Sequence, residues 1–233
     1  MSKKELAIGV LGAGGNIGHT HSQNIATYVD GARLAAVYDL NTERAEEVAK
    51  TYGAKVMASA EELIASPEID AVVIASWDGT HADLAVKCIQ AGKPVFSEKP
   101  LANTAADGKE IVEAEMAGGK HLVQVGFMRR YDRGYRQVKE LIDSGKFGAP
   151  MVIKCTHRAD GVADDYTTAM AVTDTAIHEI DVLPWLVNDE WDEVQCIMPK
   201  TNSKVKNALK DPQIIKQFDA LDKSKNSEEN HPA

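Results

Sequence analysis

The first candidate for chemistry in this sequence is a lysine followed directly by a proline, Lys99-Pro100. The apolar pair Val95-Phe96 ahead of it is typical of a buried parallel strand, so Lys99 is expected at the carboxyl end of that strand. Open parallel sheets bind ligands at this end, and the proline ring fixes the backbone there. A lysine ammonium held in this way stabilises an oxyanion as it forms. An ordinary solvated Lys-Pro turn is the structural alternative.

Asp174 and His178 are a second candidate group, because residues four apart share one face of the helix predicted over 172–186. An imidazole is a good general base near neutral pH, and a neighbouring carboxylate fixes its tautomer and stabilises its charged form. The alternative is an aspartate at a helix start and a buried, structurally satisfied histidine. With His157 the pair has no compact ligand spacing, so no metal site is predicted.

A glycine-rich loop is the third candidate. An apolar strand over 6–11 is followed by Gly12-Ala13-Gly14-Gly15-Asn16-Ile17-Gly18 and then by a helix-like run. Glycines permit a tight turn and a close approach to a pyrophosphate, whose charge is met by backbone N–H groups and the helix start. The spacing departs from the usual G-x-G-x-x-G, which predicts a phosphate loop longer by one residue.

An acidic residue, Asp39, ends a strand predicted over 33–38 and lies 21 residues after Gly18. A carboxylate at this distance accepts hydrogen bonds from both hydroxyls of the adenosine ribose and repels a 2′-phosphate, which favours NAD over NADP. Arg44 is close enough in the sequence to weaken that preference. As structure alone, Asp39 caps the next helix together with Asn41 and Thr42.

Helices and strands alternate through the first half, which is the pattern of a doubly wound parallel sheet in an α/β fold. Further helices are predicted over 43–52, 60–65, 81–91 and 105–117, and further strands over 71–75, 95–96 and 121–127. Ser76 follows another strand and joins the candidates for cofactor binding, as does Glu98, while Asp78 or Thr80 is a possible helix cap. Residues 1–127 are therefore predicted to form a NAD-binding Rossmann domain.

The second half places polar residues at the ends of its predicted elements. Arg129 and Arg130 precede a helix over 135–144, where one of them is suited to orient a polar substrate, although arginines at a helix start usually lie on the surface. His157 ends a strand over 150–157, with ligand contact and simple exposure as the two interpretations. Further strands are predicted over 192–198 and 211–215, which gives a partial substrate and oligomerisation domain over 128–215 and a disordered tail over 216–233.

Composition limits the classes of partner. The chain has 233 residues, 44% of them hydrophobic, which is enough for a sizeable core. An excess of acidic residues gives a net charge of -9, which opposes binding to nucleic acid and to anionic membranes and favours a small-molecule partner. A cytoplasmic location is predicted because no signal peptide or membrane span is visible. Cys88, Cys155 and Cys196 are predicted to be buried, reduced thiols.

Four of these motifs together resemble the inositol dehydrogenase branch of the glucose-fructose oxidoreductase family. They are the glycine loop, Glu98-Lys99-Pro100, Met128-Arg129-Arg130-Tyr131-Asp132 and Asp174-x-x-x-His178, and the resemblance runs from about residue 5 to 215. It implies NAD as cofactor, a homotetramer, and a Rossmann domain joined to an α+β domain with an open, mostly antiparallel sheet. It also implies a cis bond before the motif proline, here Lys99-Pro100.

Roles for individual residues follow from the same resemblance. Lys99, Asp174 and His178 form the implied catalytic group, and Arg129 and His157 hold the hydroxyls of a cyclic polyol. The residues predicted at the cofactor are Gly12, Gly14, Asn16, Ile17, Gly18, Asp39, Ser76 and Glu98. His178 takes the hydroxyl proton with Asp174 supporting it, Lys99 stabilises the alkoxide, and hydride passes from carbon to NAD.

The carboxyl end departs from the family, whose members continue well beyond the matching part. The sequence therefore resembles a truncated member, and two hypotheses of different classes stand. One is an NAD-dependent dehydrogenase of inositol catabolism that acts on myo-inositol or a close isomer, as a homo-oligomer if its second sheet forms. The other is a catalytically inactive NAD-binding fragment. A sugar dehydrogenase on the same scaffold is the alternative within the enzyme class.

Overall fold

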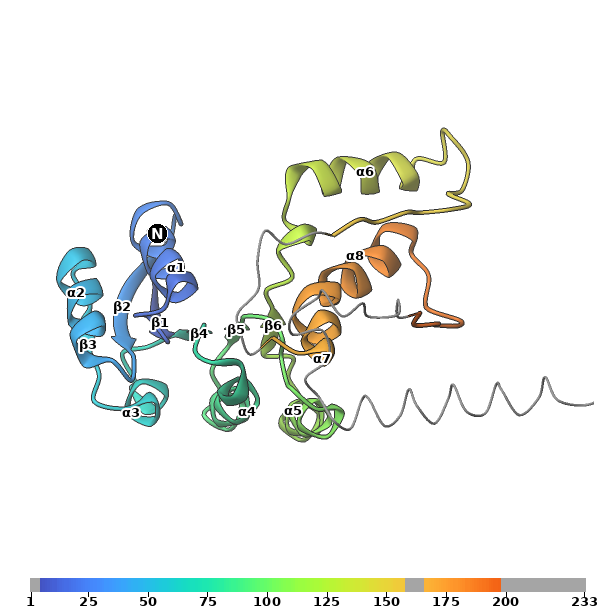
Figure 1. Ribbon diagram of the computed structural model, residues 1–233. Coiled ribbons are helices and arrows are strands. Elements are labelled where there is room, and N and C mark those ends of the chain that lie inside the picture. Colours follow the sequence, from blue (N-terminus) through green and yellow to red (C-terminus); the bar gives the residue numbers. More distant parts are fainter. Residues whose placement is uncertain (1–4, 158–165, 198–233) are drawn as a thin grey trace, which may run out of the picture. The chain divides into compact units, whose positions relative to one another are not determined.

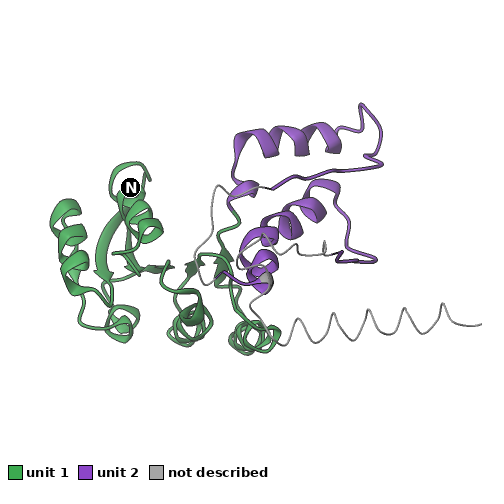
Figure 2. Ribbon diagram, in the orientation of Figure 1, with its two compact units in different colours: residues 1–127 green, residues 128–233 purple. Residues whose placement is uncertain are grey.

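The computed structural model describes residues 5–157 and 166–197 of the chain. The chain divides into two compact units, residues 1–127 and 128–233, which Figure 2 shows in different colours. Among the described residues, strands occur in unit 1 alone, and unit 2 contains helices and irregular segments.

Unit 1 contains a sheet of six parallel strands in the order β3-β2-β1-β4-β5-β6 (Figure 1). The strands are β1 (Leu6–Leu11), β2 (Ala32–Tyr38), β3 (Lys55–Val56), β4 (Ala71–Ile74), β5 (Val95–Ser97) and β6 (Val123–Val125). The helices are α1 (Asn16–Thr27), α2 (Thr42–Tyr52), α3 (Ala60–Ala65), the short 3₁₀ helix η1 (Asp78–Thr80), α4 (His81–Gln90) and α5 (Ala105–Gly118). The order reverses between β1 and β4, the point where doubly wound sheets bind ligands, and the predicted Rossmann fold is confirmed.

Alternating side chains of the central strands fill two cores, one on each face of the sheet. Val10 packs on one face with Ile25 of α1 and Val48 of α2. Its neighbour Leu11 packs on the other face in the core that contains Leu84 of α4. Helices therefore cover both faces, and full burial of one such side chain stabilises the fold by about 1.5–3 kcal/mol.

Polar side chains and glycines set the ends of the connecting helices. The side chains of Asn41, Ser59 and Thr104 each accept a backbone hydrogen bond in the first turn of α2, α3 and α5. Gly53 and Gly119 end α2 and α5 with φ angles of 74° and 65°, a left-handed conformation that glycine adopts readily. These caps fix where each helix turns back toward the sheet.

Unit 2 begins with the 3₁₀ helix η2 (Met128–Arg130) and α6 (Arg133–Asp143). After residue 165 come α7 (Thr168–Met170), a π-helical stretch η3 (Ala171–Ala176) and α8 (Ile177–Val187). α8 packs against α6, buries Val182 and Leu186, and ends at Asn188, whose φ is 56°. The predicted helix over 172–186 is therefore α-helical only from Ile177 onward.

Two strands expected in unit 2 are not formed. Residues 150–157 and 192–197 have no regular secondary structure. Apolar residues in both segments favoured strands, but a strand needs a neighbour to pair its backbone N–H and C=O groups, and the described part of unit 2 contains no other strand. The predictions for these segments were therefore wrong. The strand predicted over 211–215 and the tail over 216–233 lie outside the described residues.

The cysteines also differ from expectation. Cys88 is buried in the core of unit 1, and burial raises the pKa of its thiol to about 12. Cys155 and Cys196 are exposed, because they lie in the two segments that form no strand. The prediction of a buried, reduced thiol holds for Cys88 and was wrong on burial for the other two.

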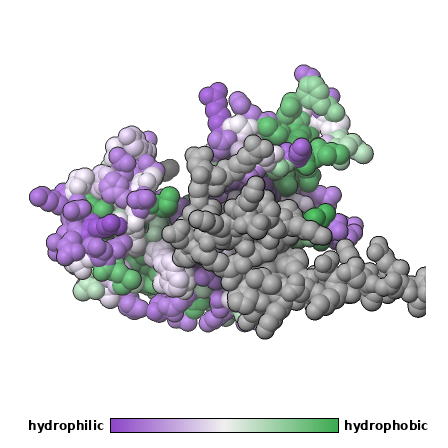
Figure 3. Space-filling view, viewed as in Figure 1, coloured by the Kyte–Doolittle hydropathy of each residue, from purple (hydrophilic) through white to green (hydrophobic). Residues whose placement is uncertain are grey.

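The surface of unit 2 carries exposed apolar residues. Figure 3 shows hydrophobic side chains gathered at the end of α6 and on the segment that follows it. Phe147, Met151 and Val152 are exposed there to 72%, 90% and 87%. No helix within the described ranges is both long and apolar enough to cross a membrane.

Candidate functional site

The glycine loop connects β1 to α1, and its glycines allow backbone contacts that a side chain would block. A Cβ on Gly18 would overlap the carbonyl oxygen of Gly12, and one on Gly12 would lie 2.5 Å from the backbone nitrogen of Ser76. Gly12 also has a φ of 82°, which favours glycine. The first turn of α1 has no acidic residue, so its N–H groups are open to a negative ligand. The loop therefore fits a phosphate group.

Asp39 lies at the end of β2 and contacts this loop. Its carboxylate accepts hydrogen bonds from the backbone N–H groups of Gly14 and Asn41, both at 2.8 Å. The side chain of Asn41 caps α2 by accepting a hydrogen bond from the N–H of Arg44 at 3.0 Å. The capping role considered for Asp39 therefore belongs to Asn41. Each carboxylate oxygen of Asp39 keeps a second lone pair that can accept from a ligand.

A polar cavity of about 580 Å³ lies beside the loop, between the start of α1 and α2. Gly14 and Asn16 line it from the loop, and Arg44 lines it from α2. This volume suits part of a dinucleotide. Ile17, which was also predicted at the cofactor, does not line the cavity and is 53% exposed.

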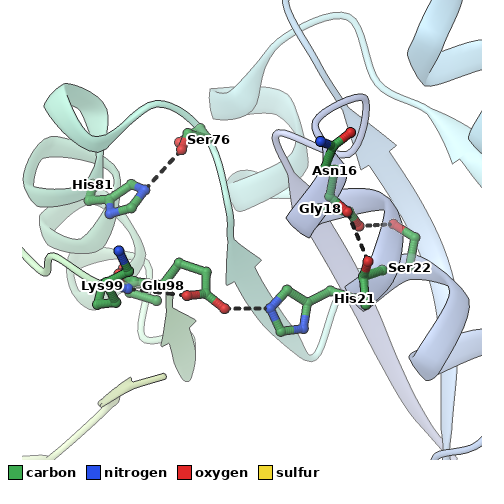
Figure 4. Close-up of polar contacts among 10 residues, drawn as sticks. Asn16, Gly18, His21, Ser22, Ser76, His81, Glu98 and Lys99 are labelled. Atoms are coloured by element: carbon green, nitrogen blue, oxygen red, sulfur yellow. Dashed lines mark hydrogen bonds and ion pairs between the residues drawn. The ribbon is translucent and has the colours of Figure 1, made fainter. Parts of the chain in front are cut away.

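Two histidines that the sequence reasoning did not single out contact the neighbouring strand ends (Figure 4). His21 of α1 places its Nε2 2.7 Å from Oε1 of Glu98, which follows β5. His81, the first residue of α4, is buried, with Nδ1 2.8 Å from the carbonyl oxygen of Pro100 and Nε2 3.0 Å from that of Ser76. The segments that follow β4 and β5 therefore both make side-chain contacts with helices of unit 1.

The charge of Glu98 is set by these neighbours. Burial by itself would raise the pKa of its carboxyl group, but the hydrogen bond and charge of His21, with smaller effects of Lys99, bring the pKa below its ordinary value. Glu98 is therefore ionised at neutral pH, directly beside Lys99. The peptide bond between Lys99 and Pro100 is cis, which confirms the expectation from the family resemblance.

In unit 2, Glu179 of α8 joins the two residues predicted to hold substrate, and the sequence reasoning missed it. Its carboxylate accepts a hydrogen bond from Nη1 of Arg129 at 2.5 Å and lies 3.4 Å from Nδ1 of His157. Burial alone would raise the pKa of Glu179, but the hydrogen bonds of Arg129 and His157 bring it below the usual range. The sequence signal available was its place directly after His178.

His178 is buried in the first turn of α8, with its ring centre 6.5 Å from that of His157. Asp174 lies in the π-helical stretch η3 ahead of α8. π-Helical turns are rare and often occur at functional sites. They are wider than α-helical turns, so a spacing of four residues does not by itself place this pair on one helix face. The catalytic roles of both residues stay a prediction.

Arg130, the other arginine considered, makes a two-pronged contact with Asp181 of α8. Its Nε and Nη2 donate to the two carboxylate oxygens at 2.9 and 2.6 Å. This pairing ties η2 to α8, so Arg130 has a structural partner within unit 2.

The predicted site residues divide between the two units. Unit 1 contains Lys99 and all the residues predicted at the cofactor, whereas unit 2 contains Arg129, His157, Asp174 and His178. Within unit 1 the structure brings Asp39 to the glycine loop and Ser76 against Gly12. Within residues 5–157 and 166–197, no group of three or more His, Cys, Asp or Glu side chains is arranged to hold a metal ion.

Family models and relatives match both units. The model described as oxidoreductase family, NAD-binding Rossmann fold, matches residues 6–127, and the GFO/IDH/MocA C-terminal domain matches residues 135–220. Inositol 2-dehydrogenase of Pseudomonas savastanoi pv. phaseolicola is 47% identical over 212 residues, which is 90% of this chain and 63% of that protein. Inositol 2-dehydrogenase 3 of Saccharopolyspora erythraea is 49% identical over 208 residues, which is 89% of this chain and 61% of that protein. The chain thus spans less than two thirds of the length of these relatives.

A solved structure gives the same result for the fold. Myo-inositol dehydrogenase from Lactobacillus casei, solved with NAD(H) and myo-inositol, has a TM-score of 0.81 and 39% identity, and the match covers 88% of this chain and 61% of that one. The six-stranded parallel sheet and the glycine loop of unit 1 are the features that a family of this description requires. The chain belongs to the oxidoreductase family with an NAD-binding Rossmann fold.

Proposed function

We propose that this chain oxidises a cyclic polyol, myo-inositol or a close isomer, to the ketone with NAD. The observation that carries the proposal is the likeness to the myo-inositol dehydrogenase solved with NAD(H) and myo-inositol. The curated relatives named inositol 2-dehydrogenase support the same substrate class.

The proposed place of NAD is the carboxyl edge of the sheet in unit 1. The backbone N–H groups of the glycine loop and the start of α1 would hold the pyrophosphate, since both present positive charge to an anion. Asp39 would accept the ribose hydroxyls and favour NAD over NADP. Ser76 and Glu98 would complete the contacts along the neighbouring strand ends. Bound NAD supplies the hydride acceptor.

In the proposed reaction His178 takes the proton of the reacting hydroxyl, and Asp174 supports the charged imidazole. The ammonium of Lys99 stabilises negative charge on the alkoxide oxygen as the carbon loses its hydride. Arg129 and His157 hold other hydroxyls of the polyol. Glu179 supports this assignment, because it contacts both side chains and lies next to His178 in the chain.

An NAD-binding fragment without catalytic activity is the second candidate. It is favoured by the shared length, 63% of the Pseudomonas relative, and by the absence of strands over 150–157 and 192–197. A sugar dehydrogenase on the same scaffold differs from the leading proposal only in substrate. Homotetrameric assembly and a cytoplasmic location stay predictions.

The test is NADH formation from purified chain with NAD and myo-inositol, repeated with NADP and with glucose as an alternative substrate. Lys99→Ala should lower kcat by about 100-fold or more, because it removes charge stabilisation at the alkoxide. The control is Lys109→Ala, whose side chain is 75% exposed and pairs with Glu113 on the surface of α5. NAD binding without turnover by the unmodified chain would favour the fragment.

A further inference from the structure

The side chain of His81 contacts the segments that follow two strands of unit 1, and the proposed mechanism assigns it no role. It is 1% exposed. Nδ1 lies 2.8 Å from the carbonyl oxygen of Pro100. Nε2 lies 3.0 Å from the carbonyl oxygen of Ser76, a contact that Figure 4 shows. A single ring thus contacts the segments that follow two neighbouring strands, β4 and β5.

Each of these carbonyl groups belongs to a segment with a proposed function. Pro100 follows Lys99 directly, so the contact at Nδ1 fixes the backbone that carries the lysine. The backbone of Ser76 packs closely on Gly12, because a Cβ added to Gly12 would lie 2.5 Å from the backbone nitrogen of Ser76. The contact at Nε2 therefore holds Ser76 against the glycine loop.

Both partners of the ring are acceptors only. The ring donates to one carbonyl in either neutral tautomer and to both when it carries a proton on each nitrogen. A buried carbonyl that loses its donor costs free energy, so the surrounding backbone moves when the ring is replaced by an apolar side chain. The hydroxyl of Ser76 also contacts that of Thr80 at 2.7 Å, which limits this segment to a small range of positions.

We propose that His81 is a positioning residue with two separable effects. Through Nδ1 it holds the Lys99-Pro100 turn, and through Nε2 it holds the Ser76 segment at the cofactor edge. The effect on Lys99 during turnover rests on the proposed function, whereas the effect on the Ser76 segment requires only that unit 1 binds NAD.

Two substitutions each keep one of the ring's two contacts and remove the other. His81→Asn carries an amide nitrogen near the position of Nδ1, and His81→Gln carries one near the position of Nε2, so each retains one contact. We expect His81→Gln to keep the Kd for NAD within about twofold and to lose about tenfold in kcat, as for one misplaced hydrogen-bonded group. We expect His81→Asn to raise the Kd for NAD about tenfold and to keep kcat at saturating NAD within about threefold. His81→Leu should show both losses.

The stability control is Ile89→Val, a substitution in the buried face of α4 that leaves the strand ends untouched. Thermal unfolding of all variants shows how far each is destabilised. If Asn and Gln variants match Ile89→Val in Kd and kcat at comparable unfolding temperatures, His81 is an ordinary core residue and the proposal is wrong. The proposal is also wrong if His81→Asn and His81→Gln both raise the Kd for NAD and lower kcat by the same factors. The effects of the two contacts would then not be separable.

A readout independent of turnover separates this inference from the proposed function. Acetic anhydride modifies the lysine amines of the folded chain, and the rate at Lys99 is measured by mass spectrometry of the peptide that contains it. His81→Gln should change this rate by about threefold or more, whereas His81→Asn should leave it unchanged. This result would support the positioning of Lys99 even if the unmodified chain fails to oxidise a polyol. An unchanged rate in His81→Gln would refute it.

Discussion

The contact between Glu98 and His21 makes stability depend on pH in a defined direction. The folded pKa of Glu98 lies below its ordinary value, so the ionised carboxylate stabilises the fold at pH above the unfolded pKa, about 4.3 for a glutamate. This contribution is lost as the pH falls through the folded pKa. The free energy of unfolding of the wild type should therefore exceed that of Glu98→Gln at pH 6, and the difference should shrink toward pH 3.

Urea unfolding of both proteins across this pH range measures the difference. Glu113→Gln is the control, because Glu113 lies on the surface of α5 and is 62% exposed in its side chain. A difference between wild type and Glu98→Gln that stays constant with pH would contradict the assignment of the ionised form.

Glu179 should affect substrate binding and leave the cofactor unaffected. Glu179→Gln removes the charge that holds Arg129 and His157, so we expect KM for the polyol to rise about tenfold, as for a weakened charged hydrogen bond. The Kd for NAD should not change, because these residues all belong to unit 2. Steady-state kinetics and calorimetric titration with NAD measure the two quantities, with Glu193→Gln as an exposed control in the same unit. A changed Kd with an unchanged KM would count against this role.

Two of the residues missed from the sequence, His21 and Glu179, have partners that are distant in the chain. His21 and Glu98 are 77 positions apart, and Arg129 and Glu179 are 50 apart. Strand ends and a glycine loop have local patterns, so Lys99 and Asp39 were visible as candidates. A histidine within a helix has no such pattern, since its role depends on the element that packs against it.

At the scale of elements, the approach of α1 to β1 depends on the absence of a side chain at Gly18. Gly18→Ala places a Cβ into the carbonyl group of Gly12, so the helix must move. We expect a loss of roughly 3 kcal/mol or more in the free energy of unfolding, as for other overpacked sites, and a large loss of NAD affinity. Denaturant unfolding and calorimetric titration with NAD test both.

Gly108→Ala provides the matched control in α5. A Cβ at this position would meet the nearest side-chain atom at 3.9 Å, an ordinary contact, and alanine favours the helix interior over glycine by about 1 kcal/mol. This variant should be as stable as the wild type or more so and should bind NAD normally. Equal destabilisation by both substitutions would show that the close approach at Gly18 is not the cause.

The larger elements of unit 1 could be predicted because their patterns are local. Apolar strands of four or more residues and capped helices carry their own signals, and β1, β2 and α2 end within one or two residues of the predicted positions. β3 was missed, since its two residues are too few for a pattern. The π-helical stretch was missed as well, because no local composition distinguishes it from an α-helix.

At the scale of the whole molecule, the sheet of unit 1 was predicted from the alternation of helices and strands, whereas the two strands predicted within the described part of unit 2 did not form. A parallel sheet built from successive helix and strand units pairs each strand with others encoded nearby. An antiparallel sheet needs all its strands, and a single apolar segment does not determine whether partners are present. The segments 150–157 and 192–197 are thus apolar enough to suggest strands and yet lack regular structure.

The exposed apolar residues after α6 predict salt-dependent self-association. The net charge of -9 keeps molecules apart at low salt, but at about 0.15 M salt this repulsion is screened beyond roughly 8 Å. The apolar surface at Phe147, Met151 and Val152 then attracts at short range. Val152→Lys should reduce association at this salt concentration while changing stability by less than about 0.5 kcal/mol, because the side chain is 87% exposed.

Light scattering against protein concentration at low and physiological salt measures this effect. Val29→Lys is the matched control, since it makes the same change in charge at an exposed site of unit 1. If both variants reduce association equally, the surface after α6 has no special part, because a substitution at an exposed valine of unit 1 has the same effect. If Val152→Lys alone reduces it, the apolar segment holds the molecules together, and its replacement gives a monodisperse chain for the measurements of NAD and polyol binding.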